Sequence, residues 1–142
     1  MKALLPFLKP TNLLFTFSLA LLAATTPACS PQFDKAGLDN ITNTGGQLTT
    51  LMGKATEPFG KHSAAVSKIQ DEIAKATEHA AGQKRNTEIA KSWKVLGEEL
   101  ATPFFNRWKE KGILDKDYIK ESVGQVGKSL DAIKKAEMAK KK

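Results

Sequence analysis

Cysteine and histidine are the side chains in this sequence most suited to chemistry near neutral pH. The 142 residues contain one cysteine, Cys29, and two histidines, His62 and His79. A thiol becomes a nucleophile when a positioned base takes its proton, and no histidine lies near Cys29 along the chain. A lone cysteine also cannot form an intrachain disulfide. We therefore expect no catalytic role for Cys29. The reason for a cysteine at this position has to come from the segment in which it lies.

The two histidines could in principle ligate haem or a metal inside a helical bundle. Met52 falls on the same predicted helical face as His62, so a haem pair is conceivable. A zinc site needs three or four ligands, and no cluster of His and Glu converges here. Neither histidine has Glu or Asp three positions before it, as a di-iron bundle would require. We predict no cofactor and no metal, and expect His62 to be a polar interruption of an apolar seam.

Two stretches come close to ligand-binding motifs. Residues 122–129, "SVGQVGKS", have Ser122 where a phosphate-binding loop needs glycine, and no strand is predicted before them. The stretch that begins "DKDYIKE" at residue 115 places Asp at two positions of a calcium loop. Lys120 replaces its glycine, and Val126 stands where its bidentate Glu should be. We expect neither site, and no enzymatic activity.

The first 28 residues have the order of an export signal. Lys2 and Lys9 supply a basic start, and residues 13–24, "LLFTFSLALLAA", form an apolar run. That run is shorter than the roughly 20 residues that span a bilayer. Small residues follow it, as they do before a cleavage site. The sequence predicts a signal peptide over residues 1–28, which is removed from the mature protein.

The stretch "TPAC", residues 26–29, resembles the lipobox of bacterial lipoproteins. Ala28 and Cys29 match the small residue and the cysteine of that motif, whereas Thr26 and Pro27 depart from its usual residues. The resemblance implies that Cys29 is acylated, with palmitate or a similar chain, and becomes the mature N-terminus. The alternative is ordinary cleavage after Ala28, which would leave a soluble periplasmic or secreted protein.

The same resemblance implies a location. Ser30 follows the cysteine, in place of the Asp that marks retention at the inner membrane. We therefore expect an outer-membrane lipoprotein of the cell envelope that faces the periplasm. The membrane is then a partner through the lipid, and an envelope protein or a second copy of the chain is a further possible partner.

Apolar residues recur in heptads from residue 38 to residue 80, which predicts a seam along one helical face. One series is Leu38, Gly45, Met52, Phe59, Val66, Ile73 and Ala80; the other is Ile41, Leu48, Ala55, His62, Ile69 and Ala76. Beside the seam lie Gly46, Gly53 and Gly60, where we expect a neighbouring helix to approach closely. The lysines at positions 54, 61, 68 and 75 also repeat every seven residues, which is typical of a solvated face.

Breaks in this periodicity divide the chain into four segments of similar length: 34–56, 59–82, 86–111 and 115–138. Pro58 interrupts the first heptad region, as either a turn or a kink. Four matched helices with short connections predict an all-α, antiparallel up-down bundle. The alternative is a long kinked hairpin with a third helix, which would need a second chain to cover its seam.

The bundle is expected to span residues 34–138, after a tether over 29–33 and before a basic tail over 139–142. Its predicted core includes Leu48, Ile69, Trp93, Leu96, Val126 and Leu130. Among Phe104, Phe105 and Trp108, we expect one side chain to point away from the core. Gly124 and Gly127 are expected at close helix contacts.

Charge excludes one class of partner. The chain has 22 basic and 15 acidic residues, but two of the basic ones precede residue 10 and three are the final lysines 140–142. The body of the domain is therefore close to balanced. A nucleic-acid-binding protein would carry a basic groove or patch, so we expect no nucleic acid partner.

Overall fold

The computed structural model describes residues 32–141, and the regular elements over that range are all helices, with no strand. The predicted signal peptide, Cys29 and most of the predicted tether lie outside the described residues. The elements are α1 (Lys35–Gly53), a 3₁₀ turn η1 (Phe59–Lys61), α2 (Ser63–Gly82), α3 (Thr87–Val95), a π-helical turn η2 (Leu96–Ala101), α4 (Thr102–Lys111) and α5 (Lys116–Ala139). Because α3, η2 and α4 follow one another without a break, the chain forms four rods. The prediction of an all-α protein with about four helices is confirmed.

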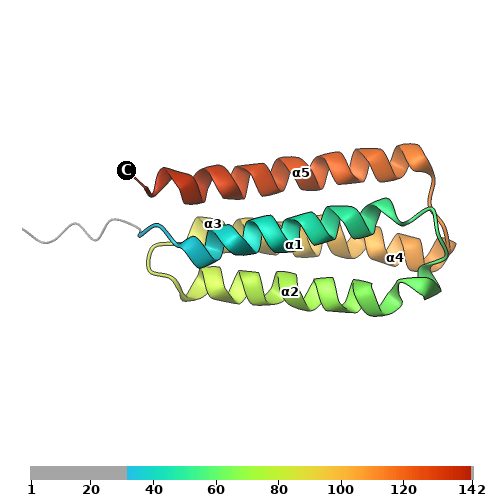
Figure 1. The fold of residues 1–142 in the computed structure, drawn as a ribbon, viewed down its shortest axis with the longest axis horizontal. Helices are drawn as coiled ribbons and strands as arrows, with labels where there is room; N and C mark the ends of the chain where they lie inside the picture. The colour runs from blue at the N-terminus through green and yellow to red at the C-terminus, as the bar shows by residue number, and fades with distance from the viewer. Residues whose placement is uncertain (1–31, 142) are drawn as a thin grey trace, which may run out of the picture.

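The four rods lie side by side, with their connections at two ends (Figure 1). One end, which we call the chain-terminal end, holds the start of α1, the α2–α3 connection and the end of α5. The other, which we call the distal end, holds the α1–α2 and α4–α5 connections. Helix α1 packs against α2 and α5, and α3 also packs against α2 and α5. Each rod thus has two direct neighbours.

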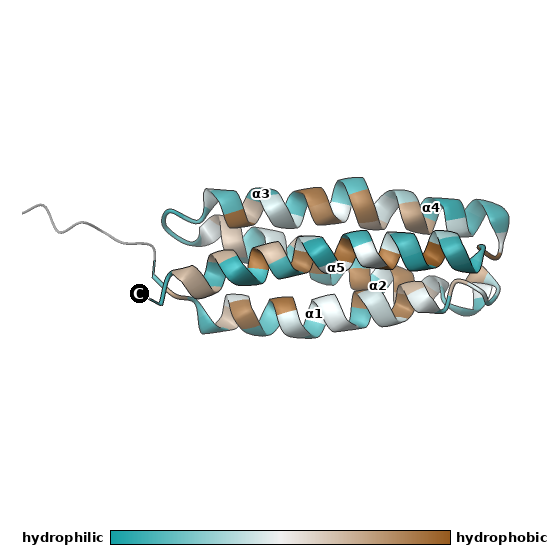
Figure 2. Cartoon of the chain, turned by 90° about the horizontal axis from the view of Figure 1, so that it is seen from above, coloured by the Kyte–Doolittle hydropathy of each residue, from teal (hydrophilic) through white to brown (hydrophobic). Residues whose placement is uncertain are grey.

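A single apolar core runs through the bundle. Both heptad series point into it, since Ile41, Leu48, Met52, Ile69 and Ile73 are all buried. The six residues predicted to lie in the core, at positions 48, 69, 93, 96, 126 and 130, belong to this one cluster. Figure 2 shows the same pattern along α5, where hydrophobic and hydrophilic bands alternate. The core assignment made from the periodicity is confirmed.

Pro58 lies in a turn, so the first of the two alternatives at this residue is correct. Helix α1 ends at Gly53, and Pro58 has an extended conformation before the 3₁₀ turn. The heptad register nevertheless passes through the turn unbroken, because each of the two helices turns its own apolar face to the shared core. Continuity of a heptad pattern therefore did not require continuity of the helix.

Pro103 is accommodated by a π-helical turn. A proline inside an α-helix has no N–H to donate, and its ring collides with the carbonyl four residues earlier. The turn just before Pro103 is widened, and the amide of Thr102 donates to the carbonyl of Gly97, five residues back. The rod can then continue to Lys111, where Gly112, with φ of 79°, ends it.

The distal end is closed by aromatic packing and by hydrogen bonds between its two connections. Leu114 N–H donates to Ala55 O at 2.8 Å, and Phe59 N–H donates to Gly112 O at 2.9 Å. The ring of Trp108 meets Phe59 edge to face, with centroids 5.5 Å apart. The two connections are thus joined to each other as well as to the core.

This closure corrects the prediction for the aromatic run of α4. Phe104, Phe105 and Trp108 are all buried, and none points away from the core. Tyr118 stacks on Phe104 with parallel rings, and the α1–α2 turn covers Trp108. Since the neighbouring segments cover α4 on more than one side, consecutive residues can both be buried. The expectation of an exposed aromatic was wrong.

Close helix approach occurs at glycines other than those predicted. At Gly46, Gly53, Gly60, Gly124 and Gly127, a Cβ atom would meet no atom within 4 Å. At Gly45, in contrast, a Cβ would lie 2.8 Å from a methyl carbon of Leu130. The predicted contacts at residues 124 and 127 were therefore wrong. The glycines that do admit a side chain of a neighbouring helix are Gly45, a member of the seam itself, and Gly97 in η2, where a Cβ would lie 3.0 Å from a methyl carbon of Ile73.

Two adjacent glycines in α1 give a direct test of this packing. Gly46→Ala should raise the free energy of unfolding by roughly 0.5–1 kcal/mol, because alanine favours the helix and the site is open. Gly45→Ala should lack that gain, since overpacking against Leu130 costs about 1–3 kcal/mol. Chemical denaturation of both variants measures the difference. Equal stabilisation by the two substitutions would contradict the α1–α5 contact described here.

Candidate functional site at the chain-terminal end

A buried carboxylate lies at the centre of the chain-terminal end. Glu137, in the last turn of α5, is only 1% exposed. Its Oε1 accepts a hydrogen bond from the Asp34 backbone N–H at 2.7 Å, and its Oε2 accepts one from Lys140 Nζ at 2.7 Å. The Lys140 side chain is itself 7% exposed. Burial of a charge is costly unless it is paired and hydrogen-bonded, and both conditions are met here.

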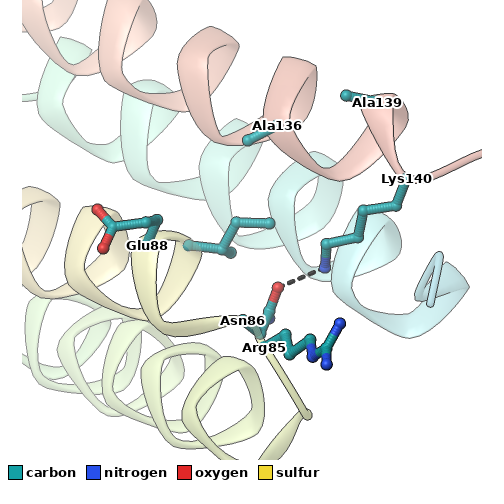
Figure 3. Close-up of a pocket in the computed structure, with 7 residues that line it drawn as sticks. Arg85, Asn86, Glu88, Ala136, Ala139 and Lys140 are labelled. Carbon is teal, nitrogen blue, oxygen red and sulfur yellow. Dashed lines mark hydrogen bonds between the residues drawn. The ribbon is translucent and has the colours of Figure 1, made fainter. Parts of the chain in front are cut away.

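Asn86 extends this network to the other two rods. Its Nδ2 donates to Ala80 O at the end of α2, at 3.1 Å, and its Oδ1 accepts from Lys140 Nζ. Figure 3 shows the Lys140 side chain directed inward from the end of α5 toward Asn86. The side chain of one buried asparagine thus joins the α2–α3 connection to α5.

Asp34 adds a second tie through its side chain. Its Oδ2 lies 2.5 Å from Nε2 of His79, near the end of α2. Partial burial raises the pKa of Asp34, but the hydrogen bond and the charge of His79, together with the nearby backbone amides of Gly37 and Ala36, hold that pKa below its ordinary value. The residue just before α1 is therefore bonded to α5 through its main chain and to α2 through its side chain.

A shallow pocket of about 260 Å³ opens beside this network. It lies between the start of α3 and the end of α5, and Ile89, Ala136 and Ala139 give it an apolar floor. Arg85 and Lys140 border it (Figure 3). Arg85 has φ of 58°, a left-handed conformation that non-glycine residues seldom adopt. The α2–α3 connection is thus held in a specific tight turn.

The other histidine lies at the distal end. His62 Nε2 is 3.1 Å from Glu57 Oε2, and the imidazole ring lies 5.4 Å from the Trp108 ring. The hydrogen bond from His62 lowers the pKa of Glu57. His62 precedes α2 in the turn, so it does not interrupt a continuous helical seam as predicted. It closes the α1–α2 turn over Trp108.

The structure does not bring the candidate ligands together. His62 and His79 are separated by 17 positions along α2, which corresponds to about 25 Å at 1.5 Å per residue. Each is hydrogen-bonded to a different carboxylate. Among residues 32–141, no group of three His, Cys, Asp or Glu side chains is arranged to hold a metal ion. Cys29, the predicted lipidation site, lies outside the described residues.

The two near-motifs take part in an ordinary helix. Residues 122–129 lie within α5, so their amides bond within the helix and form no phosphate-binding loop. Asp115 caps α5, and its Oδ1 accepts hydrogen bonds from the amides of Asp117 and Tyr118. The acidic pair that resembled a calcium loop is therefore a helix start.

Comparison with known proteins gave no relative. No protein-family model, no curated protein and no solved structure matches the chain. In the described part of the chain, none of the helices is both long enough and apolar enough to cross a membrane.

The network at the chain-terminal end was not predicted from the sequence. One signal was present: Glu137 follows Ile133 by four residues and Leu130 by seven, so a charged residue occupies a core position of the α5 stripe. A charge at such a position predicts a buried partner. The partners Asp34 and Asn86 are distant in sequence and could not be named from the periodicity.

Glu137→Ala tests the network. The substitution leaves the Lys140 ammonium and the Asp34 amide buried without their acceptor, so the free energy of unfolding should fall by about 3–5 kcal/mol. Glu88→Ala is a matched control, because Glu88 is an exposed carboxylate paired with Lys91, and it should change stability by less than about 1 kcal/mol. Urea denaturation measures both. A loss below about 1 kcal/mol for Glu137→Ala would show that the carboxylate is not needed.

Asp34 should make stability depend on pH. Its pKa is lower in the folded chain than in the unfolded one, so the ionised carboxylate stabilises the fold above about pH 4. That contribution is lost as the pH falls through the folded-state pKa. The thermal midpoint of the wild type should therefore decline more steeply between pH 5 and pH 2 than that of Asp34→Asn, measured by circular dichroism. Asp39→Asn, which removes an exposed carboxylate nearby, should keep the wild-type slope; parallel curves for all three proteins would contradict the prediction.

Proposed function

We propose that the chain is an exported bacterial envelope protein, anchored by a lipid on Cys29, whose helical domain is a non-catalytic interaction or structural module. The observation that carries this proposal is the sequence before residue 30: a basic start, a short apolar run and the lipobox-like "TPAC" in the right order. The proposed location is the periplasmic face of the outer membrane. A protein of the envelope or a second copy of the chain is the proposed partner of the helical domain.

The proposed architecture of the domain is an antiparallel up-down bundle. Support comes from the hydrogen bonds between connections, because Leu114 bonds to Ala55 at one end and Asp34 bonds to Glu137 at the other. These pairs are consistent with a chain that reverses direction after each rod. A module of this kind holds its two ends at a fixed separation, which suits a structural role.

A non-catalytic role is supported by how the polar side chains are used. The Asp–His pair at the chain-terminal end ties α1 to α2, and the histidine makes no hydrogen bond to a hydroxyl group among the described residues. The second carboxylate–histidine pair closes a turn. In each case the polar groups satisfy one another across elements, as structural groups do.

The alternative from the sequence is a soluble periplasmic bundle that binds haem or a metal. No observation favours it, because the histidines are far apart and each is already bonded to a carboxylate. An absorption spectrum of the protein purified from its native envelope distinguishes the two functions. We expect no Soret band. A Soret band that disappears in His62→Ala would overturn the proposed function in favour of haem binding.

Cys29→Ser tests the anchor. Two or more acyl chains give stable attachment, at about 0.8 kcal/mol per buried methylene group. Without the cysteine, the protein should leave the membrane fraction or accumulate as the larger precursor, which fractionation and mass spectrometry detect. Ser30→Ala keeps the cysteine and should remain in the membrane fraction. A wild-type protein found in solution with a free thiol, or with a start other than Cys29, would overturn the anchor.

A further inference from the structure

We propose that the chain-terminal end of the bundle is a membrane-facing surface that binds the anionic head groups of the bilayer. The inference rests on the proposed lipid anchor for its orientation and adds a second, electrostatic contact with the same bilayer. It concerns a surface built from three separate segments: the start of α1, the α2–α3 connection and the end of α5.

The tether restricts where this end can lie. Only five peptide units separate Cys29 from Asp34, so the fully extended chain between them spans at most about 18 Å. Asp34 is fixed to the bundle by its main-chain bond to Glu137 and its side-chain bond to His79. An acyl group on Cys29 would therefore hold the chain-terminal end close to the bilayer.

Exposed cations gather at the same end. They come from the α2–α3 connection, from the last turns of α5 and from the residue near its end: Lys84, Arg85, Lys134, Lys135 and Lys141. None of them takes part in an ion pair within residues 32–141. These side chains are free to meet an external anion.

Most carboxylates at this end are already paired with basic groups of the domain. Asp34 is bonded to His79, Glu137 is buried against Lys140, and Glu88 pairs with Lys91. Glu78 and Asp131 are the exposed carboxylates near these cations that make no ion pair within residues 32–141, and together they offset part of the five positive charges. The network described above thus removes negative charge from the surface and leaves it basic.

Phe33 gives the tether a defined exit from this surface. The ring is half-buried, and Lys141 Nζ lies over it, 4.5 Å from the centroid. The contact brings a cation from the end of the chain to the point where the tether leaves the bundle. Near an anionic bilayer each lysine or arginine strengthens binding about fivefold, and the effect weakens with salt because exposed charges are screened.

Head-group proximity can be measured at both ends of the same molecule. The acylated protein is reconstituted into phosphatidylcholine vesicles with or without phosphatidylglycerol. A fluorophore is attached at Gln83→Cys, at the chain-terminal end, or at Lys111→Cys, at the distal end. A spin label on the lipid head groups quenches fluorophores close to the surface. We expect stronger quenching at residue 83 than at residue 111, a further increase at residue 83 with phosphatidylglycerol, and loss of that increase in high salt.

Neutralising cations at one end or the other tests whether the phosphatidylglycerol-dependent quenching requires this surface or any exposed basic residues. Lys84→Gln combined with Arg85→Gln should remove the phosphatidylglycerol-dependent increase at residue 83. The matched control, Lys109→Gln combined with Lys116→Gln, neutralises two exposed lysines near the distal end and should leave it unchanged. Equal quenching at residues 83 and 111, or an increase that survives the first pair and high salt, would overturn the proposal.

Vesicle flotation distinguishes failure of the anchor from failure of the surface. Protein that floats with pure phosphatidylcholine vesicles in high salt is held by its acyl chains alone, as the proposed function requires. Protein that floats only with phosphatidylglycerol, and loses this in the Lys84→Gln and Arg85→Gln variant, overturns the anchor and supports the surface. Protein that floats with neither lipid mixture overturns both.

Discussion

The constraint on which the chain-terminal end depends is the burial of one carboxylate. Glu137 is the one charged residue in the described part of the chain that is buried as a whole. Its two oxygens need partners, and the geometry supplies an amide from before α1 and an ammonium from α5. Because Asn86 shares that ammonium, the start of α3 is held as well. A single buried charge therefore fixes how the ends of several rods meet.

Much of the helical core was predictable from the periodicity of apolar residues. Leu48, Ile69 and Val126 are buried as the heptad and helical spacing indicated. The breaks near Gly82 and Gly112 also fell where predicted, because glycine and proline act through local backbone geometry. Periodicity predicts burial at these positions because the spacing of apolar residues along one helix identifies the face of that helix that packs on the core.

The failures share a physical cause, which is that they depend on neighbours from elsewhere in the chain. Phe104 and Phe105 are both buried because distant segments cover α4, and Gly45 is crowded because Leu130 happens to face it. The Glu137 network likewise joins residues up to 103 positions apart. A single sequence shows which face of a helix is apolar, but not which side chain lies opposite it.

The position of α1 has a mechanical consequence. This helix connects the tether directly to the distal end, so tension applied between the proposed lipid anchor and the distal end would run along it. The bonds of Asp34 to Glu137 and His79 would be strained first, followed by the contact between Gly45 and Leu130. Helix α1 also contains several threonines and glycines, which are weak helix formers. A pull on the proposed anchor would therefore reach a rod of weak helix formers before it reached the α1–α2 turn that covers Trp108.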